Sequence, residues 1–390
     1  MDSLVDRFPG VRDGWARFDG PAGTQMVDTA IAAMAEWAAS GNNANTGGSF
    51  SASDACDALL ERTRATVTEL LGGSPAGICF GANMTTLTLA FTRAVAQVLR
   101  PGSRVVGTRL DHDANVTPWR LACDAAGAEH VLAPFEPTTG RLDPAAVIEL
   151  IDERTAWVAV TGASNLIGTI TDLGPIVAAA HDAGARVFVD AVHLAVHRRI
   201  DVEALGCDAL VTSPYKWYGP HAGVLCADPA VLSELPVAKV RPAPDRGPQR
   251  WETGTPSFEA LAAVDAAARF LLEEDLGRLA ARELAVFGPL LEGLSSIGGV
   301  RVWGPPTTED RAPTIAFTVD GRRPSEVVAE LAAVRIAAWS GHSYAVEAVD
   351  QLGLAESGGI VRAGVVAYVE PEDVTRLLEA VERIATTPRT

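Results

Sequence analysis

Short apolar runs alternate with amphipathic stretches along the first two thirds of the chain. Each apolar run is rich in Val, Ala, Leu or Ile and is bounded by turn residues, which is typical of a buried strand. Such strands are predicted at 104–108, 155–161, 185–189, 208–212 and 222–227, with helices at 118–126, 144–151 and 173–183. Alternation of this kind indicates an α/β fold in which a mainly parallel sheet is wrapped by helices.

The pattern changes after about residue 265. The predicted elements there are helices at 258–274 and 276–295, strands at 301–303 and 314–319, a helix at 324–334, a strand at 360–366 and a final helix at 371–384. This order is typical of a smaller α+β domain. We therefore expect a large domain over residues 20–265 and a small domain made of residues 1–19 and 266–390.

Composition narrows the function classes. The 390 residues are 48% apolar, enough for a large core, and the formal net charge of −17 argues against binding to nucleic acid or anionic lipid. The sequence contains no run of 18 apolar residues, so no membrane span is predicted. The N-terminus lacks an export signal, and a cytoplasmic location is therefore expected. The five scattered cysteines show no CxxC spacing, so no metal site is predicted and the thiols are expected in the core.

Polar, chemically capable residues follow four of the predicted strands. Asp190 and His193 follow one strand, and Ser213 and Lys216 follow the next. The segments Leu110–Asn115 and Gly162–Asn165 follow two others. Because ligands bind beyond the carboxyl ends of parallel strands, these side chains are expected to meet at one edge of the sheet.

The pair formed by Lys216 and Asp190 is the most informative feature. A lysine held near a buried acid suits an aldehyde cofactor, because the amine can form a Schiff base while the carboxylate keeps a pyridine nitrogen protonated. A phosphate site is expected at Gly81–Thr86, which follows the apolar run 77–80 and opens a helix at 87–99. Free N–H groups at a helix start bind phosphate, although Asn83 and Thr85 also suit ordinary helix capping.

Six motifs, in the right order, resemble those of fold-type I pyridoxal-5′-phosphate enzymes, specifically the class V aminotransferase and cysteine desulfurase group. They are Asp-His-Asp-Ala-Asn-Val-Thr-Pro-Trp (111–119), Ser-Asn-Leu-Ile-Gly-Thr (164–169), Val-Asp-Ala-Val-His (189–193), Ser-Pro-Tyr-Lys-Trp-Tyr-Gly-Pro (213–220), Trp-Glu-Thr-Gly-Thr-Pro (251–256) and Val-Arg-Ala-Gly (361–364). The resemblance covers nearly the whole chain. It implies a mainly parallel seven-stranded sheet in the large domain, a small C-terminal α+β domain, and a twofold homodimer with its site at the interface.

The resemblance also implies a role for each matching residue. Lys216 resembles the Schiff-base lysine and proton shuttle, Asp190 the partner of the pyridinium nitrogen, and His112 the ring that stacks on the cofactor. Arg362 resembles the clamp on the substrate carboxylate, a task for which a bidentate guanidinium is suited. The implied cofactor contacts are Asn83, Met84, Thr85, His112, Asn165, Asp190, His193, Ser213, Tyr215 and Lys216, with Thr255 reaching in from a second subunit.

Three positions depart from the family pattern. His193 stands where many relatives carry Gln, and Tyr215 stands where desulfurases usually carry His. The loop Trp339–Ala345 matches the segment in which desulfurases place their persulfide-forming cysteine, and here that position is Tyr344, with His342 and Ser343 beside it. Because no cysteine lies between residues 227 and 390, a persulfide relay is not expected.

The first hypothesis for the reaction is therefore a C–S lyase that acts by β-elimination on a cysteine-derived amino acid. Tyr344 or His342 would protonate the leaving sulfur, although either side chain could instead be a passive wall. An aminotransferase or epimerase of secondary metabolism remains open, since the choice depends on small differences in proton placement. A non-catalytic relative of the fold is disfavoured by Lys216, and a nicotinamide-binding protein by the lack of a GxGxxG motif.

Overall fold

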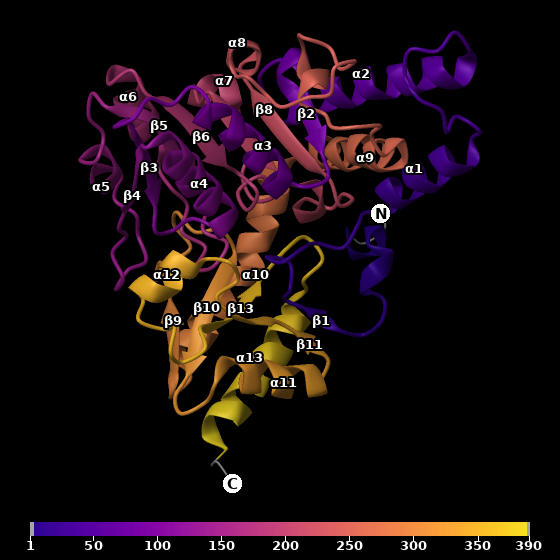
Figure 1. Ribbon diagram of the computed structural model, residues 1–390. Helices are drawn as coiled ribbons and strands as arrows, with labels where there is room; N and C mark the ends of the chain where they lie inside the picture. The colour runs from indigo at the N-terminus through magenta and orange to yellow at the C-terminus, as the bar shows by residue number, and fades with distance from the viewer. Residues whose placement is uncertain (1–3, 388–390) are drawn as a thin grey trace.

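The computed structural model describes residues 4–387, which form a large α/β domain and a smaller domain below it in Figure 1. The large domain is built on a seven-stranded sheet with the order β2-β8-β7-β6-β5-β3-β4. Its strands are β2 (Ile78–Gly81), β3 (Arg104–Thr108), β4 (Glu129–Ala133), β5 (Thr155–Thr161), β6 (Arg186–Asp190), β7 (Ala209–Thr212) and β8 (Gly223–Ala227). Strands β3 to β7 are parallel to one another, and β8 runs antiparallel to both β7 and β2.

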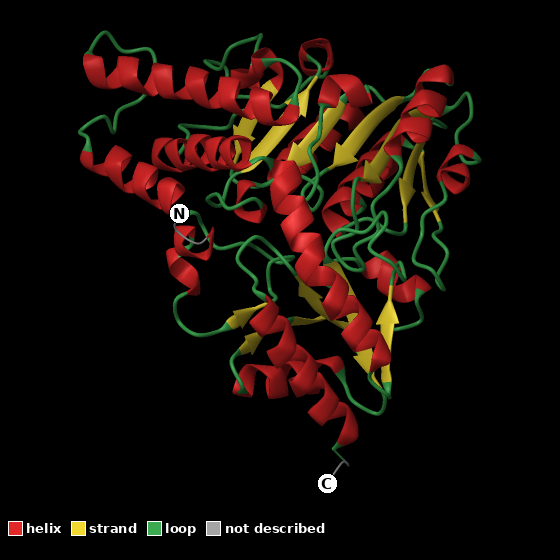
Figure 2. Cartoon of the chain, turned by 180° about the vertical axis from the view of Figure 1, so that it is seen from behind, coloured by secondary structure: helices red, strands yellow, loops and turns green. Residues whose placement is uncertain are grey.

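Helices cover both faces of this sheet, as Figures 1 and 2 show. The helices are α2 (Ser51–Leu71), α3 (Met84–Ala96), α4 (Thr117–Ala126), α5 (Pro144–Ile148), α6 (Leu173–Asp182), α7 (Val202–Leu205), α8 (Pro229–Glu234) and α9 (Phe258–Glu274). Helices α3 and α4 pack together, and so do α5 and α6. Because the sheet is covered on both sides, Val187, Phe188 and Val189 of β6 are all fully buried and read as one apolar run.

The small domain contains a four-stranded antiparallel sheet with the order β12-β13-β10-β9. Its elements are α10 (Leu276–Ser296), β9 (Val300–Trp303), β10 (Thr314–Val319), α11 (Pro324–Ala333), β12 (Trp339–Gly341), α12 (Val346–Gln351), β13 (Ile360–Gly364) and α13 (Pro371–Thr386). The N-terminal strand β1 (Ala16–Arg17) pairs in parallel with β11 (Ile336–Ala337), so the start of the chain joins this domain. Helix α1 (Asp28–Ala39) then packs on α9.

The predicted architecture is confirmed: the structure has a seven-stranded, mainly parallel sheet and a smaller domain with its own antiparallel sheet. Some elements were not predicted from the pattern, among them β4, β11, β12 and α12. They are short or half-exposed, so they lack a long apolar run. The exact domain limits of 265 and 266 remain a prediction, and they fall inside α9.

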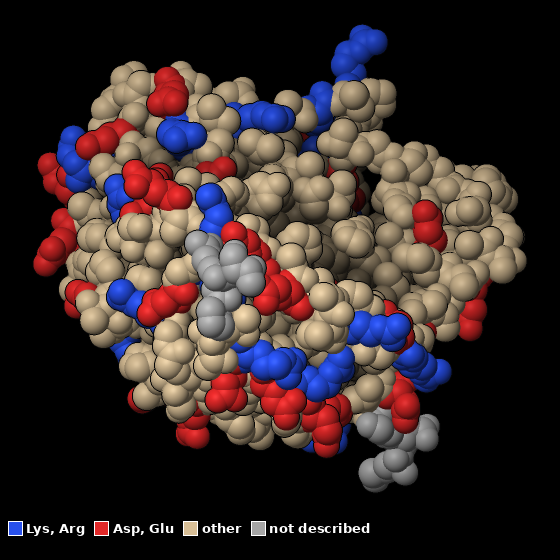
Figure 3. Space-filling model, turned by 90° about the horizontal axis from the view of Figure 1, so that it is seen from below, with Lys and Arg blue, Asp and Glu red and all other residues tan. Residues whose placement is uncertain are grey.

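Charge is unevenly distributed on the surface. Seen from the small-domain end, acidic and basic side chains are interspersed over that domain, while the projecting part at the right of Figure 3 shows few charged side chains on this face. That part corresponds to the α1 and α2 side of the molecule in Figure 1.

No helix of residues 4–387 combines the length and the apolar character that a membrane crossing requires.

A buried aromatic cluster fastens the N-terminal segment to both domains. The ring of Phe8 lies 5.1 Å from that of Tyr218, 5.8 Å from Phe270 and 5.0 Å from Tyr368. Phe8 itself is fully buried. One ring from the N-terminal segment thus contacts the loop after Lys216, helix α9 and the segment after β13.

Phe8→Ala is expected to lower the free energy of unfolding by about 3–5 kcal/mol, because it removes a buried ring and leaves a cavity. Urea unfolding followed by tryptophan fluorescence measures the change. Leu121→Ala, at a position in α4 that is 52% exposed, serves as the control and should change stability by less than about 1 kcal/mol. Equal losses in the two variants would show that the Phe8 cluster does not anchor the segment.

Candidate active site

The carboxyl ends of β5, β6 and β7 lie side by side and open into a small cavity of about 50 Å³. Asp190, the last residue of β6, stands in register with Thr161 of β5 and Val211 of β7. The cavity is lined by Met84, Thr85, His112, Thr161, Ala163, Asn165, Asp190, Val192, His193, Tyr215 and Lys216. Four predicted strand ends therefore do converge at one edge of the sheet, together with the start of α3.

Lys216 lies in a short turn, Pro214–Lys216, that follows β7. Its Nζ donates a hydrogen bond to the carbonyl oxygen of Pro21, in the N-terminal segment. Burial lowers the pKa of Lys216 from 10.5 to about 7; the positive charge of Arg362 lowers it further, while Asp190 opposes the shift. A substantial part of this amine is therefore neutral near pH 7, which allows it to act as a nucleophile or a base.

Asp190 is buried beside the lysine. One carboxylate oxygen, Oδ1, accepts a hydrogen bond from the backbone N–H of Val192 at 2.9 Å. Burial raises the pKa of Asp190 to about 6, while that hydrogen bond and the charge of Lys216 act in the opposite direction. At pH 7 the carboxylate is mostly ionised, so it can stabilise a positive charge placed above it.

The imidazole of His112 forms another wall of the cavity. Its Nδ1 accepts a hydrogen bond from the N–H of Ala114 at 3.0 Å. Burial, followed by the charges of Lys216 and Arg362, lowers the pKa of His112 to about 4, so the ring is neutral at physiological pH. Beneath this turn, Asp111 accepts hydrogen bonds from Thr108 and Asn115 at 2.5 and 2.8 Å.

The loop between β12 and α12 closes over the outer side of His112. The Tyr344 ring stacks on His112 with a centroid distance of 5.4 Å and an interplanar angle of 21°, although Tyr344 is 65% exposed. Ser343 and Tyr344 have φ values of +49° and +59°. The large domain holds this strained turn: Asn165 Nδ2 donates to the Ser343 carbonyl at 2.8 Å, and the N–H of Asp113 donates to the Tyr344 carbonyl at 2.7 Å.

His342 lies at the solvent-exposed edge of the same loop. Its Nδ1 accepts a hydrogen bond from the N–H of Tyr344 at 2.9 Å, and the two rings meet edge to face at 5.9 Å. The two residues thus form a small aromatic group with His112 at the mouth of the cavity.

Arg362, on β13, places a buried cation from the small domain close enough to lower the pKa values of Lys216 and His112, although its side chain does not line the cavity. One of its terminal nitrogens donates to the Asn165 carbonyl at 2.9 Å. Burial lowers the pKa of Arg362 to about 10, so it stays charged at pH 7. Within residues 4–387, neither Arg362 Nε nor the buried Asn165 Oδ1 has a hydrogen-bond partner. Buried polar atoms are normally satisfied, so these two fit contacts to a bound molecule that carries an acid group and a donor.

The N-terminus of α3 forms the remaining wall. Asn83 Oδ1 caps the helix by accepting from the Thr86 N–H at 2.9 Å, and Ser213 Oγ accepts from the Met84 N–H at 3.2 Å. The helix geometry gives the Thr85 N–H no internal partner. Gly223 lets β8 approach this turn closely, since a Cβ there would lie 2.4 Å from the Asn83 carbonyl carbon.

Eight of the predicted residues line the cavity: Met84, Thr85, His112, Asn165, Asp190, His193, Tyr215 and Lys216. Arg362, Tyr344 and His342 do not line it. Asn83 and Ser213 lie behind the cavity wall, because their side chains support α3 rather than line the space. Thr255 lies on an exposed loop, where its hydroxyl accepts from Asn45 at 3.3 Å, and it does not line the cavity of its own chain. Thr161, Val192 and Pro21 were not predicted as site residues. Thr161 and Val192 lie at predicted strand ends but carry little chemistry of their own, whereas Pro21 reaches Lys216 through packing across 195 positions of the chain.

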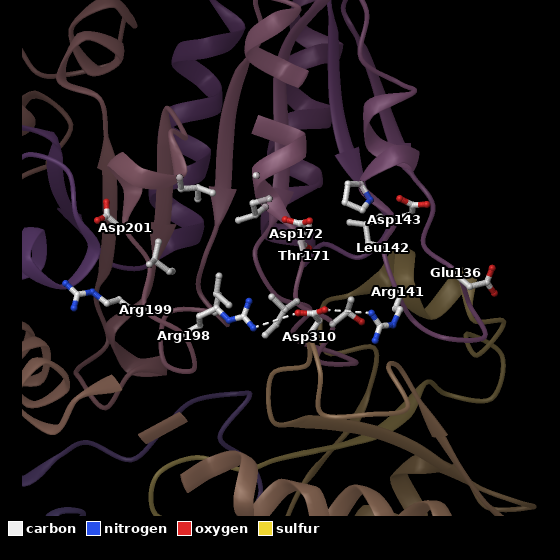
Figure 4. A pocket seen from close by; sticks show the side chains of 18 residues that line it. Glu136, Arg141, Leu142, Asp143, Thr171, Asp172, Arg198, Arg199, Asp201 and Asp310 are labelled. Atoms are coloured by element: carbon white, nitrogen blue, oxygen red, sulfur yellow. Dashed lines mark ion pairs between the residues drawn. The ribbon is translucent and has the colours of Figure 1, made fainter. Parts of the chain in front are cut away.

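A second cavity, of about 750 Å³, lies at a different place and is shown in Figure 4. Asp310 there stands between Arg141 at 3.9 Å and Arg198 at 4.0 Å. None of the predicted site residues lines it. The residues described also contain no cluster of three His, Cys, Asp or Glu side chains placed to hold a metal ion.

Comparison with known proteins places the chain in a family. Residues 17–377 match the model of the class V aminotransferases. The chain is 30% identical to an uncharacterized protein of Mycobacterium tuberculosis over 95% of its length and 96% of that protein's. It is also 30% identical to a cysteine desulfurase of Escherichia coli, over 73% and 72% of the two chains.

Solved structures agree with this placement. The cysteine desulfurase of Thermococcus onnurineus superposes with a TM-score of 0.92 at 25% identity, covering 99% of this chain and 98% of the other. The cysteine desulfurase CsdA of Escherichia coli gives a TM-score of 0.88 at 25% identity, with 98% of each chain covered. The chain belongs to the class V aminotransferase family, and it is a pyridoxal-5′-phosphate-dependent enzyme related to the cysteine desulfurases.

Proposed function

We propose that this enzyme is a C–S lyase, which breaks the bond between Cβ and sulfur in a cysteine-derived amino acid. The observation that carries the proposal is the loop over the cavity, where Tyr344 stacks on His112 in the segment that holds the reactive cysteine of desulfurases. All five cysteines of the chain are free and buried, so none presents a thiol at the cavity mouth. The similarity to cysteine desulfurases supports a cysteine-type substrate.

The residues around the cavity fit the cofactor of the family. Lys216 would hold it covalently, Asp190 would pair with its ring nitrogen, and His112 would lie against the ring. Asn165 and His193 would be the neighbours of the ring hydroxyl. The phosphate binds at the start of α3, near Met84, Thr85, Ser213 and Tyr215, where Asn83 caps the helix. The two buried atoms without partners, on Asn165 and Arg362, support this assignment.

Each step of the elimination has a matching group. The bound cofactor supplies an electron sink for the pair left at Cα when its C–H bond breaks. Lys216 accepts the Cα proton at Nζ, since its lowered pKa leaves the amine partly neutral. Arg362 binds the substrate carboxylate through a bidentate contact. Tyr344 or His342 donates a proton to the sulfur as the Cβ–S bond breaks; with one water consumed, the products are a thiol, pyruvate and ammonia.

We also propose a homodimer in the cytoplasm. Thr255 lies outside the cavity of its own chain and is exposed, which supports a contact with the cofactor of a second subunit. Two apolar side chains of the α1–α2 region are exposed, Ile31 on α1 and Phe50 before α2, which suits a subunit contact there.

Transamination is the second candidate, because the matching family model is that of the class V aminotransferases. The two reactions share the removal of the Cα proton and differ in where a proton returns. A single product measurement separates them.

The wild-type enzyme is expected to release thiol, pyruvate and ammonia from at least one member of a panel of S-substituted cysteines, as measured by mass spectrometry. Lys216→Ala should abolish turnover and the visible absorbance of the lysine-bound cofactor while the circular dichroism spectrum is retained. A stoichiometric pyridoxamine band on mixing with amino acid alone, without thiol release, would establish transamination instead. Full turnover by Lys216→Ala would exclude both reactions as formulated.

Tyr344→Phe keeps the ring on His112 and removes only the hydroxyl. If that hydroxyl protonates the sulfur, kcat should fall by about 10²–10⁴-fold with KM nearly unchanged. His342→Asn is the matched variant in the same loop, and it should lose less than Tyr344→Phe. If kcat falls only in His342→Asn, the proton donor is His342. An unchanged kcat in both variants would show that neither side chain donates the proton and that the loop only encloses the cavity.

Covalent attachment of pyridoxal phosphate to the cofactor-free protein should accelerate with pH around a midpoint near 7. The amine must lose its proton to react, and the pKa of Lys216 is lowered from 10.5 to about 7. Arg362→Leu removes a positive charge that lowers this pKa, so the midpoint should move to higher pH. Stopped-flow absorbance measures the rate. Arg199→Leu, at an exposed position outside the cavity, should leave the midpoint in place.

A further inference from the structure

Glu283 is a buried carboxylate in α10, the helix that leads from the large domain into the small one. The residue is 1% exposed and does not line the cavity of Lys216. Its Oε2 lies 2.7 Å from Nδ1 of His197, and its Oε1 accepts a hydrogen bond from the Tyr218 hydroxyl at 3.1 Å. Both oxygens are therefore satisfied, as a buried carboxylate requires, and they are satisfied by two different loops.

The loop that Glu283 contacts through Tyr218 carries Lys216. Tyr218 comes two residues after the lysine and has a φ of +69°, a conformation that a residue with a Cβ adopts only when its surroundings impose it. Its ring is fully buried, and its hydroxyl accepts from the N–H of Ala367 at 3.1 Å while it donates to Glu283. The phenol thus fixes the strained end of the lysine loop between α10 and the segment after β13.

The loop that Glu283 contacts through His197 carries Asp190 and His193. His197 lies four residues after His193, and its ring packs edge-on against the His193 ring at a centroid distance of 5.2 Å and an angle of 75°. On its other side, His193 Nε2 lies 2.8 Å from the hydroxyl of Thr314 on β10. The orientation of His193 is therefore set by Thr314 and by a His197 ring that Glu283 holds in place.

We propose that Glu283 is a positioning residue of the active site, which holds the Lys216 loop and the Asp190–His193 loop in a fixed relation to one another. This inference rests on the proposed assignment of Lys216, Asp190 and His193 to the cofactor site. Groups that act on one bound molecule must be held to within about 0.5 Å, and that precision comes from the residues behind them. From its place on α10, Glu283 contacts both loops and thereby fixes the position of each relative to the other.

A purely structural role for Glu283 makes a different prediction. If Glu283 serves only stability, the loss of its buried carboxylate should destabilise the fold and leave the affinity for the cofactor unchanged. A positioning role predicts that cofactor affinity and kcat fall by more than the loss of stability explains. The matched control is Leu294→Ala: Leu294 is fully buried on the same helix and lies eleven residues, or about 16 Å, further along it.

Glu283→Gln in the full chain keeps the size of the side chain and removes its charge. We expect the Kd for pyridoxal phosphate to rise about tenfold or more, and kcat on the S-substituted cysteine that the wild type turns over fastest to fall about 10²-fold with little change in KM. Leu294→Ala should lower the melting temperature at least as much and change the cofactor Kd less than about twofold. Equal cofactor Kd values in Glu283→Gln and Leu294→Ala would overturn the proposal.

Tyr218→Phe removes one hydroxyl and keeps the test decisive if Glu283→Gln fails to fold. It should raise the cofactor Kd in the same direction, and in a soluble double variant the combined effect should be smaller than the sum of the single effects. An unchanged Kd in Tyr218→Phe, or additive effects in the double variant, would count against coupling through Glu283. Because the cofactor Kd does not depend on which reaction follows, absence of thiol release by the wild type would contradict only the C–S lyase.

Discussion

The site depends on an amine and a carboxylate that are buried in the same small space. Strands β6 and β7 are parallel neighbours, so their carboxyl ends deliver Asp190 and the turn of Lys216 to one edge of the sheet. Burial disfavours both charged forms, and it moves the two pKa values toward each other, to about 6 for Asp190 and about 7 for Lys216. The fold thereby provides a lysine that can act as a base and a carboxylate that can pair with a cation, both near neutral pH.

The rest of the large domain can be understood as support for this pair. After the lysine turn the chain reverses, and β8 runs back antiparallel to β7, so both ends of the Lys216 segment are held by the sheet. The same strand places Gly223 against the start of α3, which brings the helix terminus to the cavity. The N-terminal segment completes the enclosure, with the Pro21 carbonyl on the lysine and Phe8 packed against Tyr218.

Sequence reasoning succeeded where a residue's position follows from local pattern. Asp190, His193, Asn165 and Lys216 lie within four residues after apolar runs, so the rule for parallel sheets was enough to bring them together. It missed residues whose role arises from contacts across the fold, such as Glu283, which pairs with a histidine 86 positions earlier in the chain. An isolated glutamate in an amphipathic helix looks solvent-facing until its partners are known. The half-exposed strand β4 was missed because it offers no continuous apolar signal.

The turn at Ser343 and Tyr344 stores conformational strain at the boundary between the domains. Two successive residues with side chains stand in the left-handed region, at a cost of order 1–3 kcal/mol each, and bonds from Asn165 and Asp113 across the boundary hold them there. A displacement of the small domain that breaks those bonds would let the turn relax. The strain in the turn therefore partly offsets the two hydrogen bonds, so separating the Tyr344 loop from His112 costs less free energy than those bonds alone would imply.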